Sequence, residues 1–419
     1  MLVGQSDELV DELAAKRMER AGRRVGIIGG GQLGMYLCEA ARPLGLTTTV
    51  LMSRPDESAA HAADAVIVAA LDDLHAVRAL IETSDVITFE LEAIPETTIE
   101  MLEEAEALSQ ISVFPRLKTL RLLKDKGLQK TWLHEQSLPT LPFLVIPETQ
   151  ELSLDVIQPL GLPLVQKACQ GGYDGKGVQM IRSEKELEKA WPVSCVLEPL
   201  LDHRIEVSVI VARGCDGDVV SYPPVSMEFD ERFNAVSSVM SPASIPEQLQ
   251  RECETIARRA VNALEGIGVF AIELFIAQDG NIYINEISPR VHNSGHLTME
   301  AFTVSQFEQH IRAVVGLPLM PVVKQREFAV MLNILYDDSW NDMCPAEPCR
   351  DPVKLSLMSQ AHWYGKPEGT VGRKMGHLTT LGNSAAATGS EAFRALMSLR
   401  ATDVSRSVTS TYFKEPVCH

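Results

Sequence analysis

The chain has 419 residues, 45% of them hydrophobic, and a formal net charge of −18, so it is long enough for two or three domains. The acidic balance argues against nucleic acid and anionic membranes as partners, because both require a basic surface. No apolar run approaches the ~20 residues that a membrane-spanning helix needs, and the eight cysteines contain no CxxC pair, which favours reduced thiols in a cytoplasmic protein.

The N-terminal part of the chain begins with a predicted helical extension. Apolar residues recur at helical spacing over residues 1–22, and Gly22 ends the pattern. From Arg24 the sequence alternates strands and helices, which is typical of a parallel sheet with crossover helices. We therefore expect a Rossmann-like βαβ domain over residues 23–122.

A glycine turn follows the first predicted strand. Gly29, Gly31 and Gly34 fit the dinucleotide-binding pattern GxGxxG. The acidic residue that would bind a ribose at the end of the second strand is absent, since Leu51 to Arg54 stands there. A tight turn with close helix packing is therefore the favoured interpretation, and a nicotinamide-dependent oxidoreductase is the weaker alternative.

A second unit begins near Leu123 and contains a glycine-rich loop between two strands, from Leu162 to Ile181. It is not a Walker loop, because a strand follows it where a Walker loop has a helix. Its glycines free the backbone to approach a phosphate, and its lysines supply positive charge. The sequence therefore predicts a phosphate-binding hairpin. The residues concerned are Gly171, Gly172, Gly175, Gly177, Lys167 and Lys176.

A predicted hairpin near the end of this unit carries two glutamates. The Asp-Gly pair at 279–280 is a strong signal for a two-residue turn, and such a turn pairs Glu273 with Glu286 and Phe275 with Ile284. Like charges opposed across a ladder destabilise a hairpin, so a cation is expected between them. Oxygen-only ligands favour Mg2+. The alternatives are a solvated carboxylate pair, or a bulge that moves one glutamate to the other face.

Two further stretches carry candidate binding residues. Glu198 ends a predicted strand and can accept a hydrogen bond from an adenine amine or a ribose hydroxyl, although an ordinary polar strand end is the alternative. The last unit follows Pro318, and its stretch His362–Thr379 sets four basic side chains among glycines in an acidic chain. A solvated loop is the alternative for this stretch.

Five segments match one enzyme family in order and spacing: GGGQLG, QGGYDGKG, AIELF with NEISPRVHNSGH, SQFEQHIRAVVGLPL and HWYGKPEGTVGRKMGH. They resemble the N5-carboxyaminoimidazole ribonucleotide synthetases, which are ATP-grasp enzymes of purine biosynthesis. The resemblance covers roughly Val25 to Thr379. The tyrosine-aspartate loop, PRVHNSGH and GRKMGH are specific to this branch, whereas most of the superfamily shares the glutamate pair.

The resemblance implies a mixed α/β fold of the ATP-grasp type. It consists of an N-terminal Rossmann-like βαβ domain, a central two-lobed ATP-grasp unit and a small C-terminal β-rich domain. The expected divisions are residues 1–22 for the helical extension, 23–122 for the βαβ domain, 123–318 for the ATP-grasp domain, 319–400 for the C-terminal domain and 401–419 for a tail.

The resemblance also implies the reaction. ATP, bicarbonate and 5-aminoimidazole ribonucleotide would give N5-carboxyaminoimidazole ribonucleotide, ADP and phosphate by way of carboxyphosphate. The implied cofactors are ATP and Mg2+, or Mn2+ in its place. The resemblance further implies that the protein is a homodimer, is located in the cytoplasm and acts on small molecules. A related ATP-grasp ligase that acts on a different amine or carboxylate is the alternative.

The family pattern carries over to individual residues. The metal would be held by Glu273 and Glu286. The nucleotide side comprises Lys126, Lys167, Gly172, Tyr173, Asp174, Gly175, Lys176, Gly177, Glu198, Glu206, Asn285 and Glu286. The ribonucleotide side comprises Tyr173, Asp174, Lys176, Arg290, His292, Asn293, Ser294, His296, Lys366, Arg373 and Lys374. The residues implied in catalysis are Asp174, Lys176, Arg290 and His292.

Three positions depart from the family pattern. Met35 stands where the family usually has an arginine after the glycine turn. Lys126 replaces an arginine, which keeps the charge but loses bidentate geometry. Phe229 stands where the family usually has a histidine and cannot donate a hydrogen bond, so either a neighbour such as Asp230 or Arg232 substitutes for it or the activity is altered.

Overall fold

The computed structural model describes residues 24–172, 177–202, 204–230, 232–337, 353–367 and 369–401. The predicted helical extension over residues 1–22 lies outside the described residues, and so do residues 402–419 of the predicted tail. No helix in the described part of the chain is long and apolar enough to cross a membrane.

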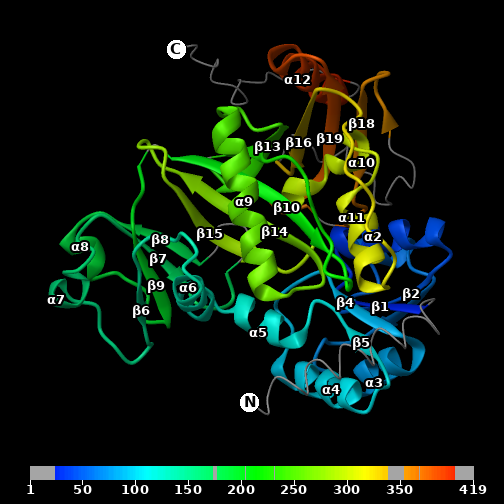
Figure 1. Cartoon of the computed structure of the whole chain (residues 1–419), viewed down its shortest axis with the longest axis horizontal. Coiled ribbons are helices and arrows are strands. Elements are labelled where there is room, and N and C mark those ends of the chain that lie inside the picture. The colour runs from blue at the N-terminus through cyan, green and yellow to red at the C-terminus, as the bar shows by residue number, and fades with distance from the viewer. Residues whose placement is uncertain are drawn as a thin grey trace.

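The first domain is a five-stranded parallel sheet with the order β3-β2-β1-β4-β5 (Figure 1). Because parallel neighbours need crossovers, helices connect the strands, as the alternating pattern predicted. The strands are β1 (Arg24–Ile28), β2 (Thr47–Met52), β3 (Ala65–Val68), β4 (Val86–Phe89) and β5 (Ser112–Val113). The α-helices are α2 (Gln32–Ala41), α3 (Leu74–Thr83) and α4 (Glu96–Ala107), and two short 3-10 helices are η1 (Arg42–Leu44) and η2 (Ser58–His61).

The glycine turn before α2 binds a carboxylate of the protein itself. The backbone N–H of Gly31 donates to Glu90 Oε1 at 2.7 Å and that of Gly34 donates to Glu90 Oε2 at 3.1 Å. A Cβ on Gly34 would lie 2.7 Å from the carbonyl oxygen of Gly29. The interpretation as a tight turn with close packing is therefore confirmed. Glu90 takes the helix-start position where a dinucleotide would place its pyrophosphate, and the neighbouring Met35 is buried in the core.

A four-stranded antiparallel sheet with the order β6-β9-β7-β8 forms the second unit. The glycine-rich segment connects β7 to β8, so it lies between two paired strands as predicted. The strands are β6 (Leu144–Ile146), β7 (Leu164–Ala168), β8 (Val178–Ile181) and β9 (Cys195–Pro199). The helices of this part are α5 (Leu117–Lys124), α6 (Lys126–Glu135), α7 (Leu154–Ile157) and α8 (Glu184–Leu187).

The rest of the molecule is built on one ten-stranded sheet with the order β15-β14-β10-β12-β13-β16-β19-β18-β17, in which β11 pairs with β10. The C-terminal strands join the strands of the central unit directly, because β16 pairs with β13. The central strands are β10 (Ile205–Arg213), β11 (Val219–Ser221), β12 (Val225–Asp230), β13 (Ala235–Ser241), β14 (Gly268–Ile276) and β15 (Ile282–Ser288). The C-terminal strands are β16 (Phe328–Leu335), β17 (Val353–Lys354), β18 (Ser359–Trp363) and β19 (Lys374–Gly382).

Helices cover this sheet and connect it to the first domain (Figure 1). Helix α9 packs on β10 and β14, helix α12 packs on β16 and β19, and α11 lies between β14 and α2. Their bounds are α9 (Glu247–Leu264), η3 (Asn293–Gly295), α10 (Thr298–Ala301), α11 (Gln306–Val314) and α12 (Ala385–Ala401).

The β14–β15 hairpin opposes Glu273 to Glu286, as predicted, but its register differs from the predicted one. The loop has three residues instead of two, because Ala277 N–H donates to Asn281 O at 2.9 Å and Gly280 adopts a φ of 84°. The predicted pairing of Phe275 with Ile284 is therefore wrong, since Leu274 pairs with Ile284. A bulge at residue 285 adds one residue to β15 and restores the alignment of the two glutamates.

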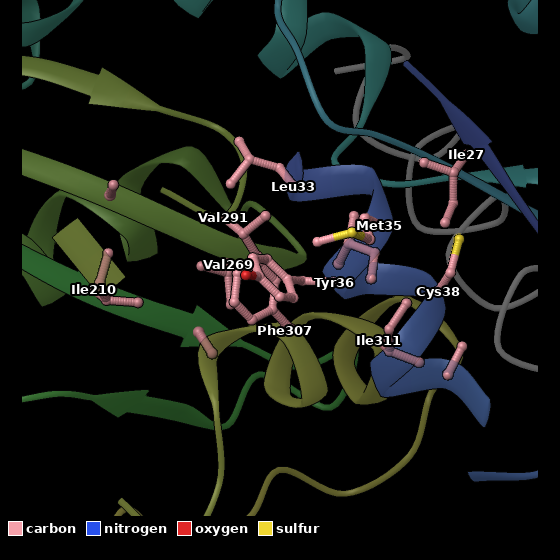
Figure 2. Packing of buried hydrophobic residues seen from close by; sticks show 14 of the residues in the cluster. Ile27, Leu33, Met35, Tyr36, Cys38, Ile210, Val269, Val291, Phe307 and Ile311 are labelled. Carbon is pink, nitrogen blue, oxygen red and sulfur yellow. The ribbon is translucent and has the colours of Figure 1, made fainter. Parts of the chain in front are cut away.

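The largest hydrophobic cluster joins the first domain to the large sheet (Figure 2). Tyr36 on α2 lies against Phe307 on α11, with ring centroids 5.0 Å apart. Val291 is buried in the same cluster and follows directly on β15. This packing therefore holds the segment after the glutamate hairpin against the first domain.

A buried histidine makes a second connection between the two sheets. His310 on α11 accepts from the backbone N–H of Val269 on β14 through Nδ1 at 3.0 Å, and its Nε2 contacts Thr88 Oγ1 on β4 at 2.7 Å. Because Nδ1 is an acceptor, Nε2 carries the proton and donates to Thr88. Burial lowers the pKa of His310 from 6.5 to about 3, so the folded protein keeps this ring neutral.

The neutral ring makes stability depend on pH. The unfolded chain protonates His310 below about pH 6.5 whereas the folded protein does not until about pH 3, so the unfolding free energy falls as the pH drops through this window. His310→Asn keeps an acceptor near Val269, and we expect it to reduce the pH slope by up to about 1.4 kcal/mol per pH unit between about pH 4 and 6. Urea unfolding at a series of pH values measures the slope, and the exposed His75→Asn serves as the control. An unchanged slope in His310→Asn would show that this ring does not stay neutral in the fold.

Candidate active site

The edge of the large sheet at β15, the small sheet and the end of the first sheet meet around the glutamate hairpin, as the contacts of Asn285 with Lys167 and of Arg290 with Glu92 show. Each contributes charged side chains. The hairpin supplies Glu273 and Glu286, α6 supplies Lys126, and β7 supplies Lys167. The elements that carry these groups are far apart in sequence, so the site exists only in the folded chain.

The bulge in β15 brings an amide next to the two carboxylates. Asn285 Nδ2 donates to Glu273 Oε2 at 3.3 Å, and Asn285 Oδ1 accepts from Lys167 Nζ at 2.7 Å. Lys126 forms an ion pair with Glu286. Neither glutamate side chain is closed off from solvent, since 23% of Glu273 and 37% of Glu286 is exposed. The face therefore presents oxygen atoms to an open site, with lysines at its edge.

The two glutamates differ in their charge state. Burial and then the charge of Glu286 raise the pKa of Glu273 well above its usual range. The pKa of Glu286 is lowered, because the attraction of the Lys126 ammonium outweighs the opposing effect of burial. The pair therefore takes up a proton on Glu273 more readily than an isolated carboxylate would, and a divalent cation bound between the two oxygens would displace that proton. Two carboxylates and an amide oxygen form a set of donors that suits a hard cation.

Glu198 is almost completely buried and contacts two lysines. Its side chain is 1% exposed, and it forms ion pairs with Lys130 and, at 2.5 Å, with Lys167. Both carboxylate oxygens therefore lie against ammonium groups, and the contact with a nucleotide that we expected for Glu198 stays a prediction. The structure does define a role, because Glu198 holds Lys167 in the position where it also reaches Asn285.

Lys130 is a site residue that the sequence reasoning missed. Its ammonium is buried, pairs with Glu198 and donates to the carbonyl oxygen of Ile284 at 3.2 Å. Burial lowers its pKa to about 8. The signal was present in the sequence, because Lys126 and Lys130 lie four residues apart on the predicted helix and so share one face.

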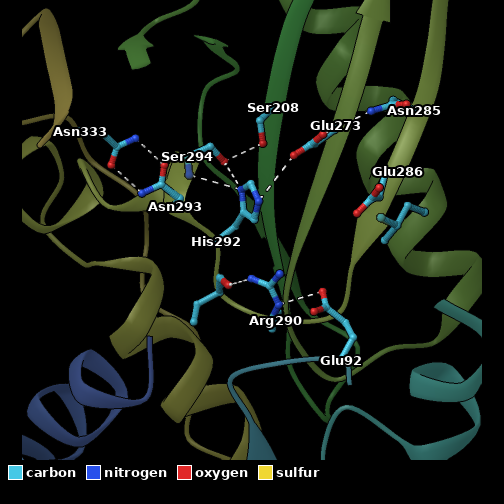
Figure 3. Close-up of polar contacts among 12 residues, drawn as sticks. Glu92, Ser208, Glu273, Asn285, Glu286, Arg290, His292, Asn293, Ser294 and Asn333 are labelled. Carbon is cyan, nitrogen blue, oxygen red and sulfur yellow. Dashed lines mark hydrogen bonds and ion pairs between the residues drawn. The ribbon is translucent and has the colours of Figure 1, made fainter. Parts of the chain in front are cut away.

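Arg290 and His292 lie on the side of the site that faces the first domain (Figure 3). Arg290 Nε lies 2.8 Å from Oε1 of Glu92, which follows the carboxyl end of β4. His292 Nε2 lies 3.5 Å from Glu273 Oε1, and its Nδ1 lies 2.9 Å from Ser294 Oγ. Glu92 was not among the predicted residues, although its place at the end of a parallel strand is where such sheets bind ligands.

The remaining residues of the PRVHNSGH segment are buried. We expected Asn293, Ser294 and His296 to contact the ribonucleotide, and the structure places all three side chains in the interior. Asn293 exchanges two hydrogen bonds with Asn333 on β16, at 2.8 and 3.0 Å. Ser294 Oγ lies 2.8 Å from Ser208 Oγ and supports His292 from behind. These hydrogen bonds hold the turn that carries His292, and the contacts with the ribonucleotide stay a prediction.

The structure places only some of the other nucleotide-side residues, and their contacts with a nucleotide stay predictions. Glu206 on β10 forms an ion pair with Arg204 at 2.7 Å, and burial raises its pKa. Gly177 has a φ of +82° and its carbonyl accepts from Ala168, while Gly172 lies just before the gap in the described residues. Tyr173, Asp174, Gly175 and Lys176 lie outside the described residues.

The basic stretch of the C-terminal unit is only partly a solvated loop. Lys374 starts β19 and is 8% exposed. Lys366 Nζ donates to the backbone carbonyl of Lys374 at 2.8 Å and lies 5.2 Å from the centre of the Tyr364 ring. The carbonyl of Arg373 accepts from the backbone N–H of Tyr336 at 2.8 Å. The structure therefore brings Lys366 and Lys374 together.

Phe229 lies at a bulge in β12 and packs at the edge of the largest hydrophobic cluster. Its neighbours Asp230 and Arg232 bind each other, with Arg232 Nη2 2.7 Å from Asp230 Oδ2 and Arg232 Nε 3.1 Å from Asp230 Oδ1. The aromatic ring therefore extends the core, and the basic residue beside it is held by an acidic one.

Comparison with protein families divides almost the whole described chain into three parts. Residues 23–124 match a ribonucleotide synthetase preATP-grasp domain, and residues 131–307 match an ATP-grasp domain. Residues 329–391 match a phosphoribosylaminoimidazole carboxylase C-terminal domain.

Curated relatives and solved structures agree with these matches. The N5-carboxyaminoimidazole ribonucleotide synthase of Bacillus subtilis is 33% identical over 87% of this chain and 93% of its own length. That of Brucella melitensis is 36% identical over 86% of this chain and 97% of its own length. The ADP complex of an N5-carboxyaminoimidazole ribonucleotide synthetase superposes with a TM-score of 0.80 at 34% identity and covers 90% of this chain and 96% of its own. The synthase of Aspergillus clavatus with ADP and 5-aminoimidazole ribonucleotide has a TM-score of 0.78 at 28% identity and covers 91% of this chain and 99% of its own.

Proposed function

The chain belongs to the N5-carboxyaminoimidazole ribonucleotide synthase family of ATP-grasp ligases, and we propose that it performs that family's reaction. It uses ATP to carboxylate 5-aminoimidazole ribonucleotide with bicarbonate, and it releases ADP and phosphate, in purine biosynthesis. The observation that carries this proposal is the opposed pair Glu273 and Glu286 with Lys126 and Lys167 beside it, at the meeting point of three units whose order matches the family.

The glutamate face suits the metal that phosphoryl transfer needs. Glu273, Glu286 and the amide oxygen of Asn285 would hold Mg2+ or Mn2+, and water and phosphate oxygens would complete the coordination. The bound ion would neutralise charge on the transferred phosphoryl group. Lys126 and Lys167 already lie against the same face and would neutralise further phosphate charge.

The chemistry is a transfer in two steps. A bicarbonate oxygen attacks the γ-phosphorus, which breaks its bond to the β-phosphate oxygen and forms carboxyphosphate and ADP. The exocyclic amine of the ribonucleotide then bonds to the activated carboxyl carbon, phosphate leaves and the amine loses a proton. His292 lies next to Glu273, and Arg290 pairs with Glu92 of the first domain, so the two residues would hold the anionic intermediate beside the amine.

The ribonucleotide phosphate would bind at the C-terminal basic stretch. A dianion cannot be attracted by the whole protein, because the net charge is −18, so a local basic cradle must hold it. Lys366 and Lys374 lie together, and Arg373 precedes Lys374 and can bind two phosphate oxygens with its two terminal nitrogens.

Family membership also underlies our proposal that the protein acts in the cytoplasm as a homodimer.

The activity test is the release of ADP with substrates supplied or omitted in turn. We expect ADP formation to require a divalent cation and 5-aminoimidazole ribonucleotide and to fall when bicarbonate is removed, because the acyl phosphate forms only from bicarbonate. Coupled spectrophotometry measures the rate, and glycinamide ribonucleotide with formate serves as the control pair. Equal ADP release with the control pair would favour the alternative, a related ligase that acts on a different amine or carboxylate.

The phosphate cradle is tested by Arg373→Ala. Phosphate binding is largely uniform between the ground state and the transition state, so we expect a strong rise in KM for the ribonucleotide, a smaller effect on kcat and little change in KM for ATP. Steady-state kinetics with each substrate varied in turn measures all three. Arg394→Ala, on the exposed face of α12, removes an equal charge from the same unit and should change none of them. A rise in KM for ATP alone would assign this stretch to the nucleotide.

A further inference from the structure

A second cluster of possible metal ligands lies where the central part of the large sheet meets its C-terminal strands. Glu300 lies on α10, His362 on β18 and His377 on β19. One ligand atom from each lies within 4.8 Å of the others. The two histidines are direct neighbours across the β18–β19 ladder, and their rings stack with centroids 4.6 Å apart at an angle of 8°. The strand pairing therefore fixes the positions of both imidazole rings before any ligand binds.

Hydrogen bonds within this cluster satisfy only half of its polar atoms. His362 Nε2 lies 2.6 Å from Glu300 Oε1, and His377 Nδ1 lies 2.9 Å from Tyr364 Oη. The other atoms of the same groups, Glu300 Oε2 and His377 Nε2, are buried and have no hydrogen-bond partner among the described residues. A buried polar atom without a partner is unfavourable, so the arrangement calls for an additional group.

Two more atoms without partners border the same place. Tyr36 Oη and His296 Nε2 are also buried and unpartnered within the described part of the chain. Their rings lie against that of His377, with centroid distances of 6.1 Å for Tyr36 and 5.0 Å for His296. Four unsatisfied atoms from four different segments therefore surround one small region of the core.

The chemistry of these atoms favours a cation. Both His377 and His296 are completely buried, and a neutral imidazole is the form that binds metals. When His377 donates its Nδ1 proton to Tyr364 Oη, its Nε2 presents a lone pair to the cluster. A ring N–H held by an outer partner is the usual arrangement for a metal-binding histidine.

We propose that Glu300, His362 and His377 form a binding site for a divalent transition-metal ion of the Zn2+ type. Two imidazole nitrogens and one carboxylate oxygen are a ligand set that suits Zn2+, which commonly takes three protein ligands and a water. The water would lie near Tyr36 Oη and His296 Nε2. The ligand set differs from the oxygen donors of Glu273 and Glu286, which favour a hard cation.

The ion would join α10 to the β18–β19 pair. Helix α10 follows the segment with His292 and His296, and the β18–β19 connection carries Lys366. Metal binding here would therefore link the segment that follows the glutamate hairpin to the strands that flank the basic stretch. The inference rests on the cluster alone and does not depend on the proposed reaction.

The test is metal binding by the full chain after removal of metals with a chelator. Isothermal titration with Zn2+ in saturating Mg2+, which occupies the hard-cation site, should give one Zn2+ per chain with a Kd in the micromolar range or below. The Co2+-loaded protein should show intense visible absorption, because a four-coordinate site with nitrogen ligands absorbs far more strongly than an octahedral oxygen site. Zn2+ should also raise the melting temperature.

Variants separate this site from adventitious binding. Glu300→Gln and His377→Gln should each weaken Zn2+ binding by about a hundredfold or more, while the exposed His75→Gln and the hairpin variant Glu286→Gln should leave it unchanged. Circular dichroism checks that each variant is folded. Weak octahedral Co2+ bands or no Zn2+ binding in the wild-type protein would each overturn the proposal. Zn2+ binding by Glu300→Gln and His377→Gln as tight as that of the wild type would also overturn it. The Co2+ spectrum needs no variant, so the proposal stays testable if both substitutions prevent folding.

Discussion

Two glutamate carboxylates face each other across the β14–β15 hairpin, and the site is arranged around their repulsion. The metal-free protein relieves it in two ways. Lys126 neutralises Glu286, and burial together with the charge of Glu286 raises the pKa of Glu273. Both arrangements are reversible, because a divalent cation could replace a proton and a phosphate could share the lysine. They support the proposal that the hairpin holds a cation together with the nucleotide.

The rest of the molecule holds charged groups against this hairpin. The small sheet presents Lys167 through the buried Glu198, and α6 presents Lys126. The first domain contributes Glu92, which holds Arg290, and its α2 packs against α11 in the largest hydrophobic cluster. The backbone N–H groups of Gly31 and Gly34 in the glycine turn of the first domain donate to Glu90 of the protein itself. The part of this turn in the site is therefore to position neighbouring groups.

Local patterns in the sequence predicted the architecture and the glutamate pair, but the pair was predicted through a wrong register. The loop between β14 and β15 is one residue longer than the Asp-Gly signal indicated, which shifts the pairing by one residue. The bulge at Asn285 adds one residue to β15 and shifts the pairing back. The two shifts compensate, so Glu273 still opposes Glu286. Asn285 occupies the bulge with a hydrogen bond to Lys167, which lies on a different sheet, and no local pattern contains that contact.

Other site residues depended on contacts that only the fold creates. His296 belongs to a polar motif, and the structure surrounds it with rings from α2, α11 and β19, which no local pattern indicated. Lys130 could have been found from its spacing to Lys126, but its partner Glu198 comes from a strand far along the chain. Spacing predicts which residues share a face of one element, whereas tertiary packing decides which faces meet.

The most direct test of the role of the hairpin is Glu273→Gln, measured both for turnover and for stability in a chelator. Among the described residues Glu273 pairs with His292 and not with a lysine, so the neutral variant should have an unfolding free energy in EDTA at about pH 8 equal to or above that of the wild type, because like-charge repulsion disappears. Its kcat should fall by roughly a hundredfold or more, which is the scale of losing one electrostatic element in a charged transition state. Wild-type turnover would contradict the account, because it would mean that the reaction does not need this carboxylate. A large loss of stability in EDTA would also contradict it, because it would mean that the carboxylate serves the fold and not the cation.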